Sequence, residues 1–362
     1  MIPLVKTYLP AKEILMPKLE EILYSGYIAQ GETVEQFERK FEAYIGEGNS
    51  LSLNSGTAAL HIAFILAGVK DGDEVISTAL TAEPTNVAIK MAGAKVRWAD
   101  IDPNTGNICP DSVESKINSK TKAILIVDYA GIPVDVERFQ QISKKYNIPV
   151  IEDAAHALGA KHNGKKAGCH FPFTIFSLQA IKHLTTIDGG ILQIKDNELY
   201  EKAKLIRWFG LDKKKSRLDN DIQIQGYKYH MNNVNACVGL LQLENISSIV
   251  DQYITNGKYF DEKLKNCPGV ELLKYYPNSE PSYWLYTLKV ENRDNFIKKL
   301  AEKNIMASEL HKRNDHHTFL NDFPEPLPML DEFYSKMVHI PCGWWVNVDD
   351  REKIAEVISK GW

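Results

Sequence analysis

The stretch Pro149-Val150-Ile151-Glu152-Asp153-Ala154-Ala155-His156 places two acidic residues directly after a short apolar run. Such a run, rich in β-branched residues, is typical of a strand buried in a parallel sheet. In open α/β sheets, ligands bind beyond the carboxyl ends of the strands, and Asp153 lies at such an end. An aspartate that caps the following helix explains the residue equally well. The stretch therefore predicts a buried strand and leaves both interpretations of Asp153 open.

Alternating strand and helix patterns surround this stretch. Apolar runs predict strands at 74–77, 95–98, 122–127, 149–152, 174–177 and 190–194, and helical spacing of apolar residues predicts helices at 57–67, 86–92 and 136–146. This order predicts an α/β fold with a mostly parallel sheet that helices cover on both faces.

The second part of the chain has a different pattern. Residues 235–265 are nearly free of glycine and carry apolar residues at helical spacing, which predicts one or two helices. A strand at 284–290 and helices at 293–303 and 349–359 follow. We therefore expect a large domain at 1–247 and a smaller C-terminal α/β domain at 248–362.

Composition narrows the class of protein. The chain has 362 residues, 44% of them hydrophobic and 25% charged, and a formal net charge of −4, so no basic surplus indicates a nucleic-acid or membrane partner. Its five cysteines are widely spaced without a CxxC pair, which argues against a disulfide framework and a zinc site. No apolar stretch resembles a spanning helix or a signal peptide, so we expect a cytoplasmic protein.

A small, hydroxyl-rich turn, Asn54-Ser55-Gly56-Thr57-Ala58, opens into an apolar helical pattern. Free N–H groups and the helix dipole at such a start attract anions, and Thr57 adds a hydroxyl. Serine and threonine also favour this position as ordinary helix caps. The turn is therefore a candidate phosphate site, with a plain helix start as the alternative.

The residues around Asp153 suit a flat, nitrogen-containing ring. A carboxylate here can pair with a protonated ring nitrogen and let the ring accept electrons from a carbanion. Ala154 and Ala155 leave room for the ring. His156 can bond a phenolic oxygen of the ring or lie over it.

Lys182 follows the predicted strand that ends at Ser177 and precedes Gly189-Gly190. A lysine that acts as a nucleophile or forms a Schiff base needs a partly desolvated site that lowers its pKa, and its apolar neighbours fit that need. Ser177 can bond a nearby phosphate. Lys228 is a weaker candidate for a phosphate contact, and for either lysine taken alone an exposed position is the alternative.

These motifs, in this order, resemble the DegT/StrS family of sugar aminotransferases, which share the type I fold of pyridoxal-phosphate-dependent transferases. Each motif is modest, but their joint order and spacing are specific. The resemblance covers almost the whole chain and runs through Ser25-Gly26, Gln30-Gly31, Ser55 to Leu60, Gly72 to Ile76, Thr121 to Ile124, Glu152 to His156, Ser177 to Gly190 and His339-Ile340-Pro341.

The resemblance implies pyridoxal 5'-phosphate as cofactor. Lys182 would be the Schiff-base lysine and the acid and base for the proton shift, and Asp153 would pair with the pyridine nitrogen near His156. The phosphate would be held by Gly56, Thr57, Ala58 and Ser177. Glutamate would be the amino donor, and the acceptor a keto group at the 3- or 4-position of a nucleotide-linked 6-deoxy sugar. The family works as a homodimer, in which segment 226–231 reaches the neighbouring subunit's phosphate.

Two positions depart from the family pattern. Where members often carry an aromatic residue near the ring, this chain has Ala82 after Thr81. The phosphate ligand from the neighbouring subunit is often asparagine, and Lys228 stands in its place. A lysine binds phosphate as a point charge, so this change is chemically tolerable.

A histidine-rich loop falls where the family builds part of its sugar-nucleotide pocket. His311, Arg313 and Asn314 are the candidate substrate contacts, because basic groups suit a diphosphate. A metal site at His311, His316 and His317 with Asp315 matches no familiar zinc spacing, and we expect none. A solvated loop is the third interpretation. The aromatic residues Tyr283, Trp284 and Tyr286 are interpreted as core rather than as a stacking platform.

Other functions stay open as alternatives. Sugar dehydratases share the fold but carry histidine at the Schiff-base position, so Lys182 favours amino transfer. A non-catalytic sensor of nucleotide sugars would bind without turnover. A nicotinamide dehydrogenase is disfavoured, because no GxGxxG follows an early strand.

Overall fold

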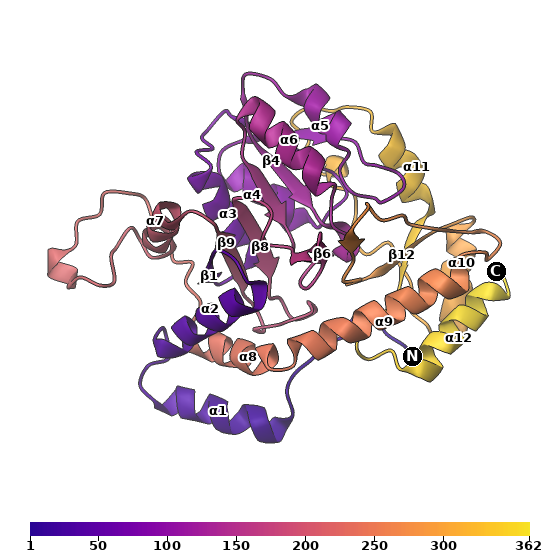
Figure 1. The fold of residues 1–362 in the computed structure, drawn as a ribbon, viewed down its shortest axis with the longest axis horizontal. Coiled ribbons are helices and arrows are strands. Elements are labelled where there is room, and N and C mark those ends of the chain that lie inside the picture. Colours follow the sequence, from indigo (N-terminus) through magenta and orange to yellow (C-terminus); the bar gives the residue numbers. More distant parts are fainter.

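A seven-stranded sheet forms the centre of the molecule in this computed structural model, which describes residues 1–362 (Figure 1). Its strands lie in the order β1 (Asn49–Leu53), β9 (Gly190–Ile194), β8 (Phe173–Ser177), β5 (Val150–Asp153), β4 (Thr121–Val127), β2 (Glu74–Thr78) and β3 (Lys95–Ala99). The strands β2, β3, β4, β5 and β8 pair in parallel, and β9 is antiparallel to both neighbours. The predicted α/β fold with a mostly parallel sheet is confirmed.

Both faces of the sheet are buried. Successive residues of a strand point to opposite faces, so neighbouring residues belong to different cores. Val75 and Leu125 belong to one apolar core, and their neighbours Ile76 and Ile124 belong to another. The first face is covered by α3 (Gly56–Leu66), α4 (Glu83–Met91) and α7 (Asn197–Arg207), and the second by α5 (Pro110–Lys116) and α6 (Val136–Tyr146). Burial on both faces explains why these strands are almost continuously apolar.

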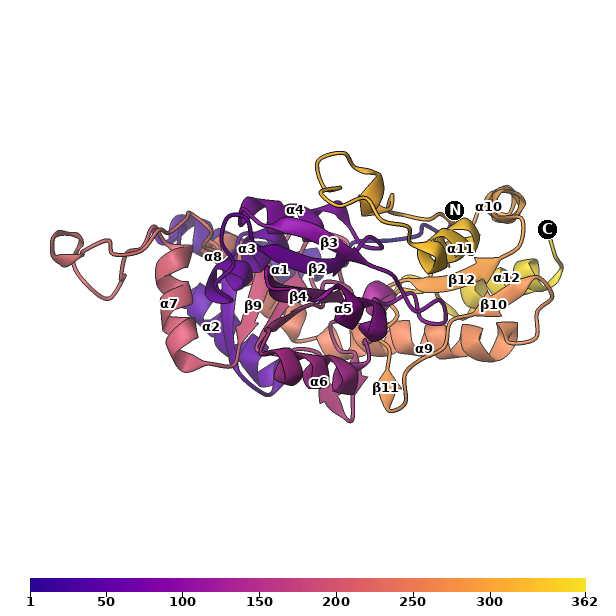
Figure 2. The same cartoon turned by 90° about the horizontal axis from the view of Figure 1, so that it is seen from above.

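Two N-terminal helices that the sequence analysis did not predict pack beside the sheet. They are α1 (Lys12–Tyr24) and α2 (Glu32–Ile45), and both lie against α8 (Asn233–Leu243). The predicted helical segment at 235–265 is two helices, since α8 ends before Asn245 and α9 (Ile246–Leu264) begins after it. Figure 2 shows α9 running from the large sheet to the C-terminal part of the molecule.

A smaller antiparallel sheet organises the C-terminal part. It consists of β10 (Val270–Leu272), β12 (Tyr286–Val290) and β13 (Met337–Ile340), with α9, α10 (Arg293–Glu302) and α12 (Val348–Ser359) sharing its apolar core. A third small sheet contains β11 (Ser279–Glu280), β6 (Lys161–His162) and β7 (Lys165–Lys166). Ile2 also belongs to the C-terminal core, and its N–H donates to the carbonyl of Asn304 at 2.7 Å. The domain boundary between 247 and 248 stays a prediction.

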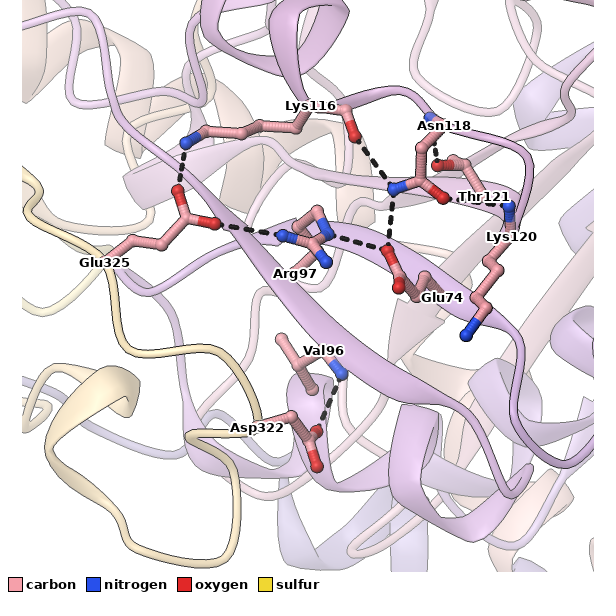
Figure 3. A network of polar contacts seen from close by, with 9 residues as sticks. All are labelled: Glu74, Val96, Arg97, Lys116, Asn118, Lys120, Thr121, Asp322 and Glu325. Carbon is pink, nitrogen blue, oxygen red and sulfur yellow. Dashed lines mark hydrogen bonds and ion pairs between the residues drawn. The ribbon is translucent and has the colours of Figure 1, made fainter.

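The open edge of β3 is covered by the loop that precedes α11 (Pro328–Lys336) (Figure 3). Asp322 accepts a hydrogen bond from the N–H of Val96 at 2.9 Å and pairs with Lys90 at 2.6 Å. Arg97 bridges Glu74 at 2.6 Å and Glu325 at 3.1 Å. Because an edge strand exposes unpaired N–H groups, these contacts close the edge and fix the loop against the large sheet.

A long arm, residues 208–232, projects from the body between α7 and α8, as Figures 1 and 2 both show. Its base is tied to α7, where Tyr227 and Tyr229 donate backbone hydrogen bonds to Ile206 and Arg207. Leu218 near its tip is 96% exposed. No helix of the protein has the length and apolarity that crossing a membrane requires.

Candidate active site

A cavity of about 380 Å³ opens beyond the carboxyl ends of β5 and β8, beside the start of α3. The predicted site residues that line it are Gly56, Thr57, Ala82, Asp153, His156, Ser177, Lys182 and His311. A wider cleft of about 830 Å³ lies between α2, α7 and the arm, but no predicted site residue lines it. In that cleft Glu38 and Arg207 pair with each other at 2.6 Å. The smaller cavity is therefore the candidate active site.

The start of α3 offers free hydrogen-bond donors to this cavity. The N–H groups of Gly56 and Thr57 have no acceptor within the chain. They lie beside Ser177, since a Cβ added at Gly56 would be 3.4 Å from the Ser177 Cβ. The strand β9 passes so close that a Cβ at Gly190 would be 2.5 Å from the nitrogen of Gly56, which requires glycine there. Free donors at a helix start, next to a hydroxyl, suit an anion such as phosphate.

Ala58, the third predicted contact at this turn, is placed differently from Gly56 and Thr57. Its N–H already donates to the Oγ of Ser55, the cap of α3, at 3.1 Å. Its side chain is buried and does not line the cavity. The phosphate donors that the turn has to offer are therefore Gly56 and Thr57.

Asp153 lies at the end of β5 with both carboxylate oxygens hydrogen-bonded. Its Oδ2 accepts from the Oγ1 of Thr85 at 2.8 Å, and its Oδ1 accepts from the N–H of Ala155 at 3.1 Å. Burial raises the pKa of Asp153, and these two hydrogen bonds and the charge of Lys182 oppose that rise. A buried carboxylate is stabilised by a cationic partner, so the cavity favours a ligand with a protonated nitrogen at this point.

The amine of Lys182 enters the same cavity. Its Nζ lies over the indole of Trp284, 3.7 Å from the ring centroid. Burial lowers the pKa of Lys182 from 10.5 to about 7, although the carboxylate of Asp153 opposes this. Much of the amine is therefore uncharged near neutral pH, which a lysine nucleophile requires.

Two histidine rings complete the walls. His156 stacks on Trp284 with centroids 3.9 Å apart, and His311 lies nearly parallel to His156 at 6.3 Å. Burial lowers the pKa of His311 to about 4 and the pKa of His156 well below its usual value, and the charge of Lys182 adds to both shifts. The Nδ1 of His156 and the Nε2 of His311 have no partner. Both rings thus stand neutral at neutral pH, each with a nitrogen free for a ligand.

Arg313 and Asn314, two of the predicted substrate contacts, do not line the cavity. Arg313 is paired with Asp315 at 2.7 Å and with Asp331. Asn314 is buried; its Nδ2 donates to the carbonyl of Thr81 at 2.8 Å, while its Oδ1 accepts from Asn86. Both residues therefore hold the loop in place while His311 faces the cavity.

Lys228 is exposed on the arm and does not line its own chain's cavity. Its predicted phosphate contact requires a second subunit and stays a prediction. No group of three or more His, Cys, Asp or Glu side chains is arranged to hold a metal ion.

Several cavity residues were missed by the sequence analysis: Glu83, Thr85, Gln179, Asp188 and Trp284. Glu83 and Thr85 begin the helix that follows β2, so the rule that pointed to Asp153 applies to them as well. Tyr283 and Tyr286 bond Asp261 in the C-terminal core, as predicted, but Trp284 between them faces the cavity. No local pattern in the sequence distinguishes it from its neighbours.

Comparison with known proteins identifies the family. The DegT/DnrJ/EryC1/StrS aminotransferase family model matches residues 11–359. This chain belongs to that aminotransferase family. The aminotransferase is 35% identical to the sugar aminotransferase CalS13 from Micromonospora echinospora, with a TM-score of 0.96 over 100% of both chains.

Two further relatives extend the comparison. The aminotransferase is 30% identical, over 95% of each chain, to the UDP-4-amino-4,6-dideoxy-N-acetyl-beta-L-altrosamine transaminase of Campylobacter jejuni. It also superposes on the PLP-form of the sugar aminotransferase Spr1654 from Streptococcus pneumoniae, with a TM-score of 0.90, 27% identity and coverage of 99% and 98% of the two chains. The predicted type I fold, aminotransferase class and pyridoxal-phosphate cofactor are thereby confirmed.

The donor set of the cavity fits this cofactor. Unpaired N–H groups and a hydroxyl stand at one end, a buried carboxylate with a raised pKa at another, and a lysine amine lies against the indole of Trp284. These are the groups that a phosphate, a pyridine nitrogen and an aldehyde each need.

Proposed function

We propose that this aminotransferase moves the amino group of glutamate to a keto group at the 3- or 4-position of a nucleotide-linked 6-deoxy sugar. The observation that carries the proposal is the amine of Lys182, with its pKa near 7, in one cavity with Asp153. The names of the Campylobacter and Micromonospora relatives support the sugar class.

Different cavity residues would bind different parts of the cofactor. The N–H groups of Gly56 and Thr57 and the hydroxyl of Ser177 would bind the phosphate. Asp153 would keep the ring nitrogen protonated, and Lys182 would hold the aldehyde carbon. When bound, pyridoxal phosphate supplies a ring that accepts electrons from the reacting carbon.

Lys182 has a second task once its amine is released. A group with a pKa of about 7 both accepts and donates a proton readily near neutral pH. Its amine would therefore carry the proton that must leave the donor's carbon and reach the cofactor's carbon, and later the reverse. Trp284 and His156 are 1% and 3% exposed, and these buried walls limit the competition of water for this proton.

The walls of the cavity suit a polyhydroxyl acceptor. His156 and His311 present neutral ring nitrogens, and Glu83 lies 4.0 Å from His311 as a carboxylate acceptor at the mouth. Neutral nitrogens and a carboxylate match the donors and acceptors of sugar hydroxyls. Ala82 contributes only a methyl group, so Trp284 and His156 provide the aromatic surface of the cavity.

No arginine lines the cavity of a single chain. At its phosphate end, the hydrogen-bond donors are backbone N–H groups and the hydroxyl of Ser177. We infer that a homodimer completes it, with the arm of one subunit bringing Lys228 to the phosphate of the other. The projecting arm, which exposes Leu218 and Ile222, supports this arrangement. A cytoplasmic location stays a prediction.

The decisive experiment supplies glutamate that carries a heavy nitrogen isotope, together with UDP- and TDP-linked 4-keto and 3-keto 6-deoxy sugars. The proposal expects a product in which the labelled nitrogen replaces the carbonyl oxygen, and no product from Lys182→Ala. A product that loses water without gaining nitrogen would instead show the dehydratase alternative. Binding of the nucleotide sugar without any turnover would support the sensor alternative.

A further inference from the structure

Trp284 contacts Lys182 at both ends of the lysine. Its indole N–H donates to the carbonyl of Ile181, the residue directly before Lys182, at 2.9 Å. Its ring face lies 3.7 Å from the Nζ at the tip of the side chain. The indole therefore bridges the backbone and the amine of the same residue.

The opposite face of the indole is occupied by His156. A stacked ring at 3.9 Å and an amine at 3.7 Å cannot share one face without overlap, so they must lie on opposite faces. The indole itself is 1% exposed, so its two faces are almost completely covered by protein.

The backbone beside Trp284 is itself fixed to the turn at Tyr129–Gly131 that follows β4. Ser282 donates to the carbonyl of Gly131 at 2.9 Å, and a Cβ at Gly131 would lie 2.8 Å from the nitrogen of Tyr283. Gly131 has a φ of +93°, which favours glycine. The contact between Gly131 and the backbone at Ser282 and Tyr283 therefore tolerates little displacement. Trp284 is thus a rigid platform that the C-terminal part of the chain supplies to the cavity.

We infer that Trp284 is a positioning residue for Lys182, which holds the ammonium group against one face of its indole while His156 packs on the other. This inference rests on the proposed role of Lys182. A free lysine side chain has four rotatable bonds, and an aromatic face attracts its charged form. The indole therefore keeps the amine aimed into the cavity whenever it is not joined to the cofactor.

The test measures the titration of Lys182 in the full-length chain without cofactor. The protein is labelled with trace acetic anhydride over a pH series, and the peptide that carries Lys182 is quantified by mass spectrometry. The titratable groups around this amine are Asp153, His156, His183, His311, Glu83 and Asp188, which all variants retain. The labelling uses neither glutamate nor sugar, so it reports on Trp284 even if the proposed reaction fails.

Wild-type Lys182 should titrate at about 7, and Trp284→Leu should lower that midpoint by roughly one pH unit, because the ammonium loses the aromatic face. Trp284→Phe keeps an aromatic face and should shift it by less. Trp344→Leu is the matched control: this tryptophan lies outside the cavity with Lys6 5.2 Å from its ring, and its loss should leave the Lys182 midpoint unchanged.

A Lys182 midpoint that is identical in wild type and Trp284→Leu would overturn the inference. So would a Trp284→Phe variant that shifts as far as Trp284→Leu, since the aromatic face would then be irrelevant. If circular dichroism shows that Trp284→Leu does not fold, Trp284→Phe decides alone: a small downward shift supports the role of the indole, and no shift refutes it.

Discussion

Lys182 sets the pH range in which this protein can capture its cofactor. Its pKa in the folded chain is about 7 rather than 10.5, so the amine is protonated below that pH and becomes nucleophilic above it. We expect the rate of covalent capture to rise with pH and to level off above about pH 7. Stopped-flow absorbance after mixing cofactor-free protein with pyridoxal phosphate measures this rate. A rise that continues toward pH 10 would contradict the desolvated site, and Lys182→Ala should show no capture.

Thr85 orients the carboxylate that the ring nitrogen needs. Its hydroxyl donates to Asp153 at 2.8 Å and accepts from Thr81 at 3.0 Å. Thr85→Val keeps the shape but removes a hydrogen bond to a charged group, which costs about 1.5 kcal/mol and should weaken cofactor binding roughly tenfold. Equilibrium titration with pyridoxal phosphate measures the loss. Thr85→Ser is the matched control, and equal weakening in both variants would mean that the methyl group, not the hydroxyl, matters.

Single site residues could be predicted where a chemically active side chain follows the end of an apolar strand pattern. Asp153 and Lys182 could be found because each follows an apolar run within a few residues. The contact of Ala58 stays a prediction, because the Ser55 cap already accepts from its N–H and the sequence does not show which donors of a helix start a cap engages. Trp284 could not be found from the sequence, since its position depends on a tertiary contact between the backbone at Ser282 and Gly131.

The same distinction holds for secondary-structure elements. The six predicted strands of the large sheet and the helices α3 and α6 were placed to within one residue at each end, because burial on both faces leaves a continuous apolar signal in the strands. The prediction for α4 began three residues late, and α5 and α7 were missed. The strand β1 was missed, since its sequence Asn49-Ser50-Leu51-Ser52-Leu53 carries buried serines that bond Gln193 and Glu38. Polar groups that are satisfied across the fold hide a buried strand from a hydrophobicity pattern.

The loop that closes the edge of β3 depends on Asp322. Its carboxylate accepts from the N–H of Val96 and pairs with Lys90, both partly buried. Asp322→Ala leaves that donor and the lysine without a partner, so we expect the free energy of unfolding to fall by about 2 kcal/mol. Urea denaturation followed by circular dichroism measures it. Asp251→Ala, which removes an exposed carboxylate without a hydrogen bond, is the control, and an equal effect in both variants would refute the role of the edge contact.

At the scale of the whole molecule, the arm exposes apolar side chains that no other part of the same chain covers. Residues 208–232 leave the body and expose Leu218 and Ile222, although exposing apolar side chains to water is unfavourable. A second copy related by a two-fold axis would receive the arm and offer its own in return, because such an interface uses the same surfaces on both subunits. Lys228 would then stand in one subunit and act in the other.

Sharing of sites between subunits makes a specific prediction for mixed dimers. Lys182→Ala removes the amine of a subunit's own site, and Lys228→Glu damages the phosphate end of its neighbour's. We expect each variant alone to have little activity. When the two are unfolded together and refolded at equal amounts, random pairing restores about a quarter of the wild-type sites, because each mixed dimer contains one site with both lysines. Amino transfer from labelled glutamate measures the recovery, and sedimentation confirms that mixed dimers form. Mixed dimers without recovered activity, or full activity in Lys228→Glu alone, would show that each subunit builds its phosphate site by itself.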